Sequence, residues 1–177
     1  TPSRVMRLGP AWSVSDPNSR FIDLDGDGKA DLLMTEDDCL VWQGSLGAEG
    51  FGAVHRIAKM LDEKHGPRCV FAEEAQTIFL ADMSGDGLTD IVRIRSGDVC
   101  YWPNMGRGKF GARVRMAHSP TFAPPNLFDP GRLRLIDVDG SGVPDLIYLG
   151  HNGTKFWSNH SGNSWGDAKD IPFAVPN

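Results

Sequence analysis

The sequence has no long apolar run, no paired-cysteine motif and no excess of basic residues, and each absence excludes a class of protein. No stretch approaches the roughly 20 apolar residues that a membrane-spanning helix needs. The net charge is −5, whereas a nucleic-acid-binding domain selects a basic face. Three cysteines (Cys39, Cys69 and Cys100) without CxxC spacing favour free thiols over a zinc site or a disulfide framework.

Motifs of catalysis are also missing. The sequence contains no nucleophile motif, no phosphate-binding loop and no paired histidine and aspartate constellation. Its five histidines are scattered over segments that we expect to be loops or strand ends: His55, His65, His118, His151 and His160. We therefore expect a protein that is not an enzyme. The first residues carry neither a signal-peptide pattern nor an initiating Met, so we expect the sequence to begin within a longer protein.

One acidic, glycine-containing loop occurs three times. The copies are the nine-residue segments 23–31, 82–90 and 137–145, which begin 59 and 55 residues apart. Their shared pattern is Asp-x-(Asp/Ser)-Gly-(Asp/Ser)-Gly-x-x-Asp. Ten of the 23 acidic residues lie in these loops, four in the first and three in each of the others. The negative charge is therefore concentrated where bound cations would neutralise it.

The spacing of oxygen donors in each loop predicts a structural calcium site. Ca²⁺ takes about six to eight oxygen ligands, usually carboxylates, backbone carbonyls and water. Positions 1, 3, 5 and 9 supply side chains, position 7 supplies its carbonyl, and glycines at positions 4 and 6 allow the positive φ angles of a tight wrap. The predicted ligands are Asp23, Asp25, Asp27, Lys29 and Asp31; Asp82, Ser84, Asp86, Leu88 and Asp90; and Asp137, Asp139, Ser141, Val143 and Asp145.

The same residues allow other interpretations of the loop. Asp and Gly are turn residues in their own right, and Asp can cap backbone N–H groups without a metal, so this alternative stays open. An EF-hand needs a bidentate Glu at position 12 between two helices. Position 12 is Met34, Arg93 or Tyr148, and the flanking runs resemble strands, which excludes the EF-hand. Mg²⁺ suits an all-protein cage less well than Ca²⁺.

Short β-branched and aromatic runs flank every loop and predict strands. After each loop come a second strand, a turn and an aromatic strand ending at Trp42, Trp102 or Trp157. A Gly-rich turn then leads to Phe51-Gly52, Phe110-Gly111 or Trp165-Gly166, which lie 9, 8 and 8 residues beyond the Trp. A fourth strand follows. Each period therefore predicts four antiparallel strands, the size of a propeller blade, with the aromatics packed between neighbouring blades.

The predicted organisation is a single all-β segment, residues 1–177, with three β-propeller blades. We place the blades at about 19–58, 76–117 and 132–174, and an N-terminal strand or extension at 1–18. The long connections, 59–75 and 118–131, are expected either to project from one rim as binding loops or to act as plain linkers. Three blades do not close a ring, since propellers have about four to eight. We therefore expect a partial propeller, or a ring that oligomerisation completes with six blades from two chains.

The loop pattern, together with the recurrent Phe-Gly or Trp-Gly, resembles the FG-GAP/VCBS repeat of integrin-like β-propellers over residues 19–177. Val41-Trp42-Gln43-Gly44, Tyr101-Trp102-Pro103-Asn104-Met105-Gly106 and Phe156-Trp157-Ser158-Asn159 further resemble the Trp-x-Asn-x-Gly blade of toxin-complex B components and virulence-plasmid B proteins. Gln43-Gly44 departs from that pattern. Proteins of this kind encapsulate a toxic domain, and their propeller docks on a pore-forming subunit.

The resemblance implies a non-catalytic, calcium-stabilised module for protein–protein docking, within a toxin-complex B-type protein that delivers a toxin. Its expected partners are a pore-forming toxin subunit or the remaining blades of the same propeller, and its expected location is secreted or extracellular. The alternative function is a calcium-dependent, lectin-like propeller that binds a glycan, because integrin-like propellers also occur in sugar-binding proteins.

Overall fold

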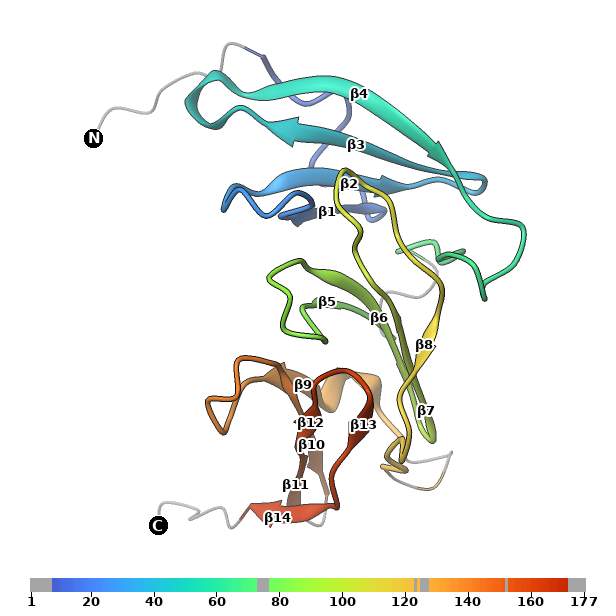
Figure 1. Cartoon of the computed structure of the whole chain (residues 1–177), viewed down its shortest axis with the longest axis vertical. Coiled ribbons are helices and arrows are strands. Elements are labelled where there is room, and N and C mark those ends of the chain that lie inside the picture. Colours follow the sequence, from blue (N-terminus) through green and yellow to red (C-terminus); the bar gives the residue numbers. More distant parts are fainter. Residues whose placement is uncertain (1–7, 73–76, 123, 125–127, 152, 172–177) are drawn as a thin grey trace. The chain divides into compact units, whose positions relative to one another are not determined.

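The structure is a computed structural model that describes residues 8–72, 77–122, 124, 128–151 and 153–171. It confirms the predicted all-β class with four-stranded, blade-like sheets (Figure 1). Within the described residues, no helix has the length and apolarity that a membrane crossing requires. The two helical elements are single 3-10 turns, η1 (Gly47–Glu49) and η2 (Pro130–Arg132).

Three four-stranded sheets follow one another along the chain, each with neighbours in sequence order. They consist of β1 (Ser19–Ile22), β2 (Asp31–Thr35), β3 (Cys39–Ser45) and β4 (Phe51–Ala58); β5 (Ile78–Ala81), β6 (Asp90–Arg95), β7 (Asp98–Trp102) and β8 (Val114–Arg115); and β9 (Leu133–Ile136), β10 (Asp145–Gly150), β11 (Gly153–Trp157) and β14 (Lys169–Ile171). A two-stranded ribbon, β12 (Asn159–His160) with β13 (Ser164–Trp165), leads into β14. The acidic loops connect the first and second strand of every sheet, as predicted.

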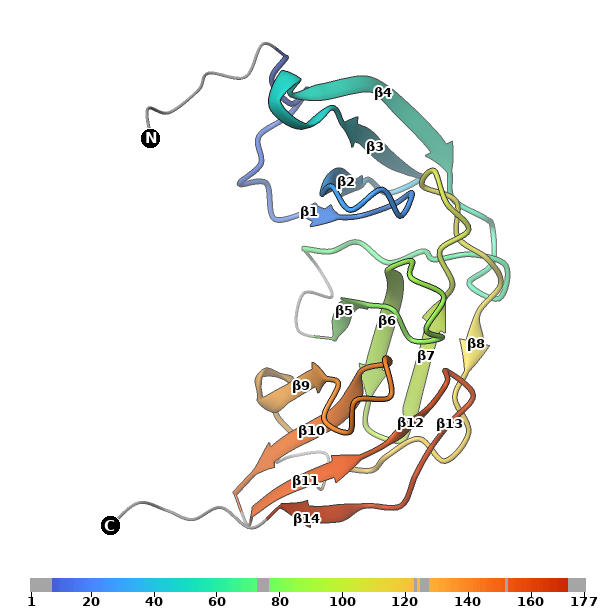
Figure 2. The same cartoon turned by 60° about the vertical axis from the view of Figure 1, so that its left-hand side comes forward.

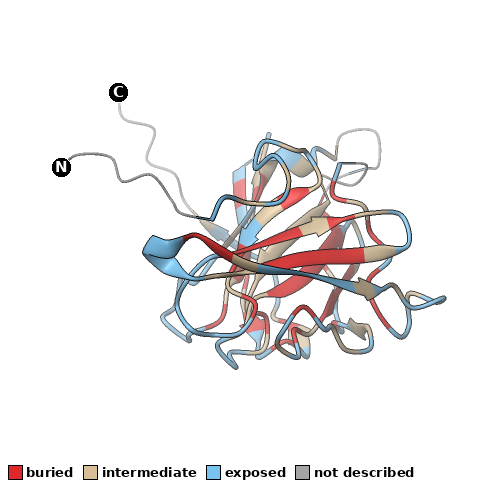
Figure 3. Cartoon of the chain, turned by 90° about the horizontal axis from the view of Figure 1, so that it is seen from above, coloured by how far each residue is buried: buried red, intermediate tan, exposed pale blue. Residues whose placement is uncertain are grey.

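The chain packs as two compact units. One contains residues 1–75, 87–89 and 102–113, and the other contains residues 76–86, 90–101 and 114–177. The turn after the third strand of the second sheet therefore belongs with the first sheet, while most of the second sheet belongs with the third. The inner strands β2 and β6 are buried on both faces, whereas β4 is largely exposed. Figure 3 shows that buried residues gather on the strands and exposed residues mostly on the loops.

Strand register corrects the predicted alignment of the three tryptophans. The residues that pair with the aromatic of each aromatic-Gly motif are Ser45 with Phe51, Asn104 with Phe110, and Asn159 with Trp165. Two residues before these pairs stand Gln43, Trp102 and Trp157. Gln43 therefore holds the tryptophan position of the first sheet, and all three spacings become eight residues. The prediction that the third strand ends at Trp42 is wrong, since β3 continues to Ser45.

This one-residue offset turns Trp42 to the other face of its sheet, because side chains alternate along a strand. Trp42 pairs with Leu33, while Gln43 pairs with Leu32. The Gln43 side chain is buried, accepts a hydrogen bond from Ala11 N at 2.7 Å and donates one to Gly52 O at 2.8 Å. A polar residue suits this face because the irregular segment before β1 covers it there and has backbone groups to satisfy.

The second unit is built around one apolar cluster between the second and third sheets. Its fully or nearly buried members are Met83, Val92, Ile94, Val99, Tyr101, Met116, Phe122, Leu133, Leu146, Tyr148, Trp157 and Trp165. Phe122 meets the Trp157 ring edge-on at 5.5 Å between ring centroids. The predicted packing of the recurring aromatics between neighbouring sheets thus holds for Trp157 and Trp165.

In the first unit, the turn that follows β7 closes against the first sheet (Figure 2). A Cβ atom at Gly108 would stand 2.6 Å from Trp42 Cδ1, so only glycine admits the ring there. Trp102 Nε1 donates to Glu63 O at 2.7 Å. The connection that carries Glu63 is further held by Phe71 N, which donates to the Thr35 hydroxyl at 2.9 Å. Within the described residues, no disulfide joins Cys39, Cys69 or Cys100, in agreement with the prediction from their spacing.

Replacement of Trp157 by Ala tests the sheet-to-sheet core. We expect Trp157→Ala to lower the free energy of unfolding by about 3–5 kcal/mol, since it leaves a large cavity between two sheets. Urea denaturation measures this loss. The matched control is Phe21→Ala, because 54% of Phe21 is exposed and its removal leaves no cavity. Equal effects of the two substitutions would contradict the packing.

Candidate metal centre

The three acidic loops share one backbone conformation, which their glycines make possible. Gly26 and Gly28 have φ angles of 78° and 79°, and the equivalent glycines of the other loops lie between 75° and 88°. A non-glycine residue is strained in this left-handed region. The predicted use of the glycines at positions 4 and 6 is confirmed.

The aspartate at position 1 organises each wrap by accepting backbone N–H groups. Asp23 Oδ1 accepts from Gly26 N and Asp23 Oδ2 from Gly28 N, both at 2.8 Å. Asp137 repeats the arrangement with Gly140 N at 2.8 Å and Gly142 N at 3.0 Å. Asp82 accepts from Gly85 N at 2.8 Å. The open alternative of Asp as a backbone cap is thus realised, and it leaves lone pairs on these oxygens.

The aspartate at position 9 joins the loop to a distant strand residue, which is the last residue of β3 in the first sheet and the first residue of β12 in the third. Asp31 accepts from Leu24 N at 3.0 Å and from Ser45 N at 2.7 Å, one bond on each carboxylate oxygen. Asp145 does the same with Val138 N and Asn159 N, at 3.0 and 2.9 Å. Sequence spacing predicted this residue as a metal ligand and gave no sign of the second bond, because its donor lies 14 residues away.

Two of the loops bring three carboxylates together. One oxygen of each of Asp23, Asp25 and Asp27 lies within 4.8 Å of the others, and the same holds for Asp137, Asp139 and Asp145. Asp31 does not belong to the first group. In the second loop, among the residues that the structure describes, no group of three acidic or other metal-binding side chains is this close. Ser84 there replaces one carboxylate.

The second loop instead contains an oxygen that lacks a partner. The Ser84 hydroxyl is shielded from solvent and has no hydrogen bond to any described residue. A buried hydroxyl of this kind costs free energy unless something binds it. An oxygen-seeking cation fits this donor, and the carboxylate clusters of the other two loops are also the hard-oxygen sets that Ca²⁺ prefers.

The first loop carries its own positive charge. Lys29 Nζ lies 2.5 Å from Asp27 Oδ2, and this hydrogen bond lowers the pKa of Asp27 and raises that of Lys29. Burial raises the pKa of Asp31, against the effect of its two N–H donors, and the charges of Asp25 and Asp23 raise it further. A cation at the loop would relieve this crowding of negative charge, because opposite charge favours the ionised carboxylate.

Position 7 has a role that spacing did not reveal. Its predicted contribution was a carbonyl, yet the side chain of Leu88 lies over Gly26, so that a Cβ there would be 3.1 Å from Leu88 Cδ2. Val143 lies likewise over Gly85, at 3.0 Å. The second and third loops thus each pack on a glycine of the preceding loop. The sequence signal for this packing was an apolar residue, Leu88 or Val143, within an otherwise polar turn.

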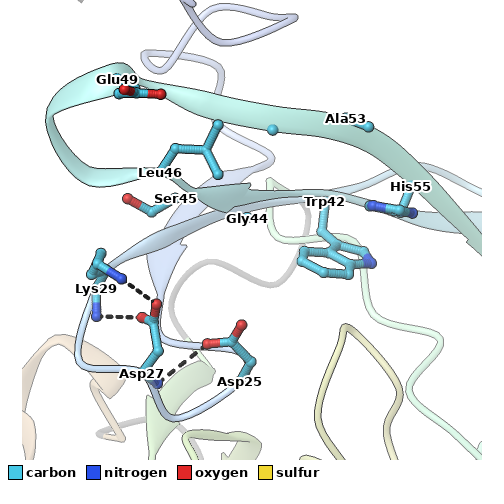
Figure 4. Close-up of a pocket in the computed structure, with 11 residues that line it drawn as sticks. Asp25, Asp27, Lys29, Trp42, Gly44, Ser45, Leu46, Glu49, Ala53 and His55 are labelled. Atoms are coloured by element: carbon cyan, nitrogen blue, oxygen red, sulfur yellow. Dashed lines mark hydrogen bonds and ion pairs between the residues drawn. The ribbon is translucent and has the colours of Figure 1, made fainter.

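A hollow opens beside the first loop (Figure 4). Its volume is about 600 Å³, and acidic and aromatic side chains line it, among them Asp25, Asp27, Glu49, Trp42 and His55. Trp42 and His55 are cross-strand neighbours whose rings stack at 4.7 Å between centroids. The hollow is open at Gly44, which has no side chain to fill it. It therefore places hydrogen-bond acceptors next to an aromatic pair.

The fold occurs in known structures. No protein-family model matches the chain, and no curated protein matches it. A chain of the Tc holotoxin pore of Photorhabdus luminescens matches with a TM-score of 0.77 and 24% identity, over 97% of this chain and 8% of that one. An Agrocybe aegerita lectin with specific recognition of non-reducing terminal N-acetylglucosamine matches with 0.62 and 23%, over 88% and 38%. The TcdB2-TccC3-Cdc42 structure matches with 0.52 and 17%, over 89% and 12%.

At these identities the likeness establishes a shared fold. The chain spans less than two fifths of each chain that it matches. The blade-like sheets therefore occur both in components of Tc toxin complexes and in a lectin.

Position 9 should matter for folding even without a metal. We expect Asp145→Asn to lower the free energy of unfolding by about 1–3 kcal/mol in EDTA, because its amide group then faces one of two buried N–H donors. Asp139→Asn is the matched control, since Asp139 is exposed and its change leaves both hydrogen bonds of Asp145 intact. Chemical denaturation in EDTA measures both. Equal stability of the two variants would refute the structural role of Asp145.

Proposed function

We propose that the chain is a non-catalytic, calcium-stabilised β-propeller segment of the FG-GAP/VCBS type, which serves protein–protein docking in a secreted, toxin-complex B-type protein. The observation that carries the proposal is the repeated blade with an acidic loop at the same place in every sheet. The fold likeness to a chain of the Tc holotoxin pore supports it over 97% of the sequence. By this proposal the parent protein encapsulates and delivers a toxin.

Calcium would be structural in this proposal. Asp23, Asp25 and Asp27 would hold it in the first loop, and Asp137, Asp139 and Asp145 in the third. In the second loop the Ser84 hydroxyl would join Asp82 and Asp86. A bound cation supplies positive charge that neutralises the clustered carboxylates, so its binding free energy adds to the stability of the fold.

Calcium removal tests this proposal. We expect EDTA to lower the melting temperature, and Ca²⁺ at about 100 times its dissociation constant to add roughly 2.7 kcal/mol of stability for each loop that binds it. Calorimetric titration of the double variant Asp25→Asn, Asp27→Asn should show one calcium fewer than the unmodified chain. Asp62→Asn, outside the loops, is the control with unchanged stoichiometry. A melt that is identical in EDTA and Ca²⁺ would overturn the calcium assignment.

Docking is supported by an apolar sheet face that the described residues leave open. Ile136 and Val138 are 51% and 49% exposed. Ile136 pairs with Asp145 as Ala81 pairs with Asp90, yet Ala81 packs against the core of the second unit. The position that packs against the core in the second sheet, Ala81, is therefore exposed to solvent in the third sheet, where Ile136 occupies it. A further blade, or a second copy that completes a six-bladed ring, would cover such a face.

The docking proposal predicts binding to a pore-forming toxin-complex subunit. We expect the purified chain to bind an immobilised subunit of this kind in biolayer interferometry, and Ile136→Asp to weaken this binding while the melting temperature stays the same. Light scattering of the free chain distinguishes closure by a second copy, at twice the mass of 19.3 kDa, from completion by other blades. Absence of binding by a natively melting chain would contradict the docking function.

The alternative function is calcium-dependent glycan binding, and a specific observation favours it. The hollow beside the first loop combines a Trp–His pair with carboxylates, and the Agrocybe aegerita lectin has the same fold. A glycan array, with N-acetylglucosamine as the first probe, separates the two functions. Calcium-dependent hits that His55→Ala abolishes would favour the lectin.

A further inference from the structure

A groove runs along the edge strand β4 on the face that carries Trp42. It consists of two hollows of about 460 and 260 Å³, which share Ile57 and Lys109 as lining residues. One side is β4 from His55 to Ala58, and the other is the turn 107–110 after β7. Both sides belong to the first compact unit. We call this feature the β4 groove.

One end of the β4 groove is apolar. Its lining includes Leu40, Ile57, Met60, Pro67 and Phe110. Met60 is 51% exposed, and its neighbour Leu61 is 96% exposed. An apolar hollow with exposed large hydrophobics at its rim is typical of a site that receives an apolar side chain.

The other end of the groove is basic, in a chain of net charge −5. Arg107 and Lys109 line it together with Arg56, and Asp25 is the one acidic residue in this lining. Arg56 is paired with Glu36 at 2.6 Å, whereas neither Arg107 nor Lys109 has an ion pair with a described residue. Of the acidic residues nearby, Glu63 is bound to Arg113 at 3.3 Å. The three cations of this end stand against two carboxylates, Glu36 on Arg56 and Asp25 in the lining, so the basic end keeps a net positive charge.

The backbone beside the groove is available for pairing. β4 is the outermost strand of its sheet (Figures 1 and 2). Among the described residues, the free edge of β4 has a backbone hydrogen bond only near its beginning, where Phe51 N donates to Leu8 O. At the other end, Lys59 N donates to Asp38 O, which continues the pairing of Cys39 with Ala58 on the side of β3. The stretch between them has unpaired N–H and C=O groups, which form a template for an added strand.

From these features we infer that the β4 groove binds an extended acidic peptide of a partner protein, which adds to β4 as a fifth strand. A carboxylate of the peptide binds Arg107 and Lys109, and a large apolar side chain two residues away fills the hollow at Ile57 and Phe110. The spacing of two residues follows because alternate side chains of a strand share one face. Edge pairing supplies affinity, and the two hollows supply specificity.

This inference rests on the proposed docking function, because it takes the partner to be a protein. It adds the chemistry of one contact with that partner. The β4 groove lies on the first sheet, whereas the exposed Ile136 lies on the third. Loss of one surface therefore leaves the other testable.

Designed peptides test the groove on the intact 177-residue chain. The probes are fluorescein-labelled Thr-Glu-Thr-Leu-Thr and Thr-Leu-Thr-Glu-Thr, with Lys in place of Glu in the control peptides. We expect at least one Glu peptide to bind in fluorescence anisotropy and to shift the Trp42 and Lys109 amide signals in NMR spectra. Reversal of both charges, Arg107→Glu with Lys109→Glu, should weaken binding at least about tenfold, the loss of one or more charge-assisted hydrogen bonds.

A charge-matched variant completes the test. Lys64→Glu with Lys155→Glu changes the net charge equally but touches no groove residue, and it should bind the Glu peptides as the unmodified chain does. Equal binding of the Lys peptides, or signal shifts confined to other surfaces, overturns the inference, as does absence of binding at about 1 mM peptide. Calcium-dependent melting measured on the same samples shows separately whether the proposed function holds.

Discussion

The fold depends on one buried charge-assisted interaction, the position 9 aspartate that holds each acidic loop to its sheet. Asp31 and Asp145 are 1% and 0% exposed, and each carboxylate accepts one N–H from its own loop and one from a residue 14 positions further on, Ser45 at the end of β3 and Asn159 in β12. Hydrogen bonds to an ionised group are about twice as strong as neutral ones. The loop therefore cannot move without breaking the register of the sheet below it.

This constraint explains how exposed, repulsive loops can stay ordered. Positions 1 and 9 fix the wrap through backbone N–H groups, and in the second and third loops the apolar side chain at position 7 packs on a glycine of the preceding loop. The remaining carboxylates project into solvent, where they are free to bind a cation. Backbone organisation and cation binding are thus complementary roles for one motif, because a carboxylate oxygen has lone pairs for both.

The sequence predicted the period, the strands and the loop conformation, because alternation and glycine placement are local signals. It failed at Trp42, where alignment by residue type conflicted with strand register. Nothing local distinguishes Trp42 from Trp157. The two sheets differ in what covers the face that carries Gln43 in the first sheet and Trp157 in the third. An irregular segment covers Gln43, whereas another sheet packs against Trp157. The join between Asp145 and Asn159 was equally hidden, since it links residues 14 positions apart.

The displaced tryptophan also creates the surface from which the groove extends. At the corresponding site of the second sheet, Tyr101 pairs with Val114, and both pack into the core of the second unit. In the first sheet, Trp42 pairs with His55 on the long, exposed strand β4, and a basic turn takes the place of a neighbouring sheet's apolar face. The same strand position therefore packs into the core in the second sheet, as Tyr101, and lines a groove in the first sheet, as Trp42. The acidic loop holds the backbone in the same way in both sheets.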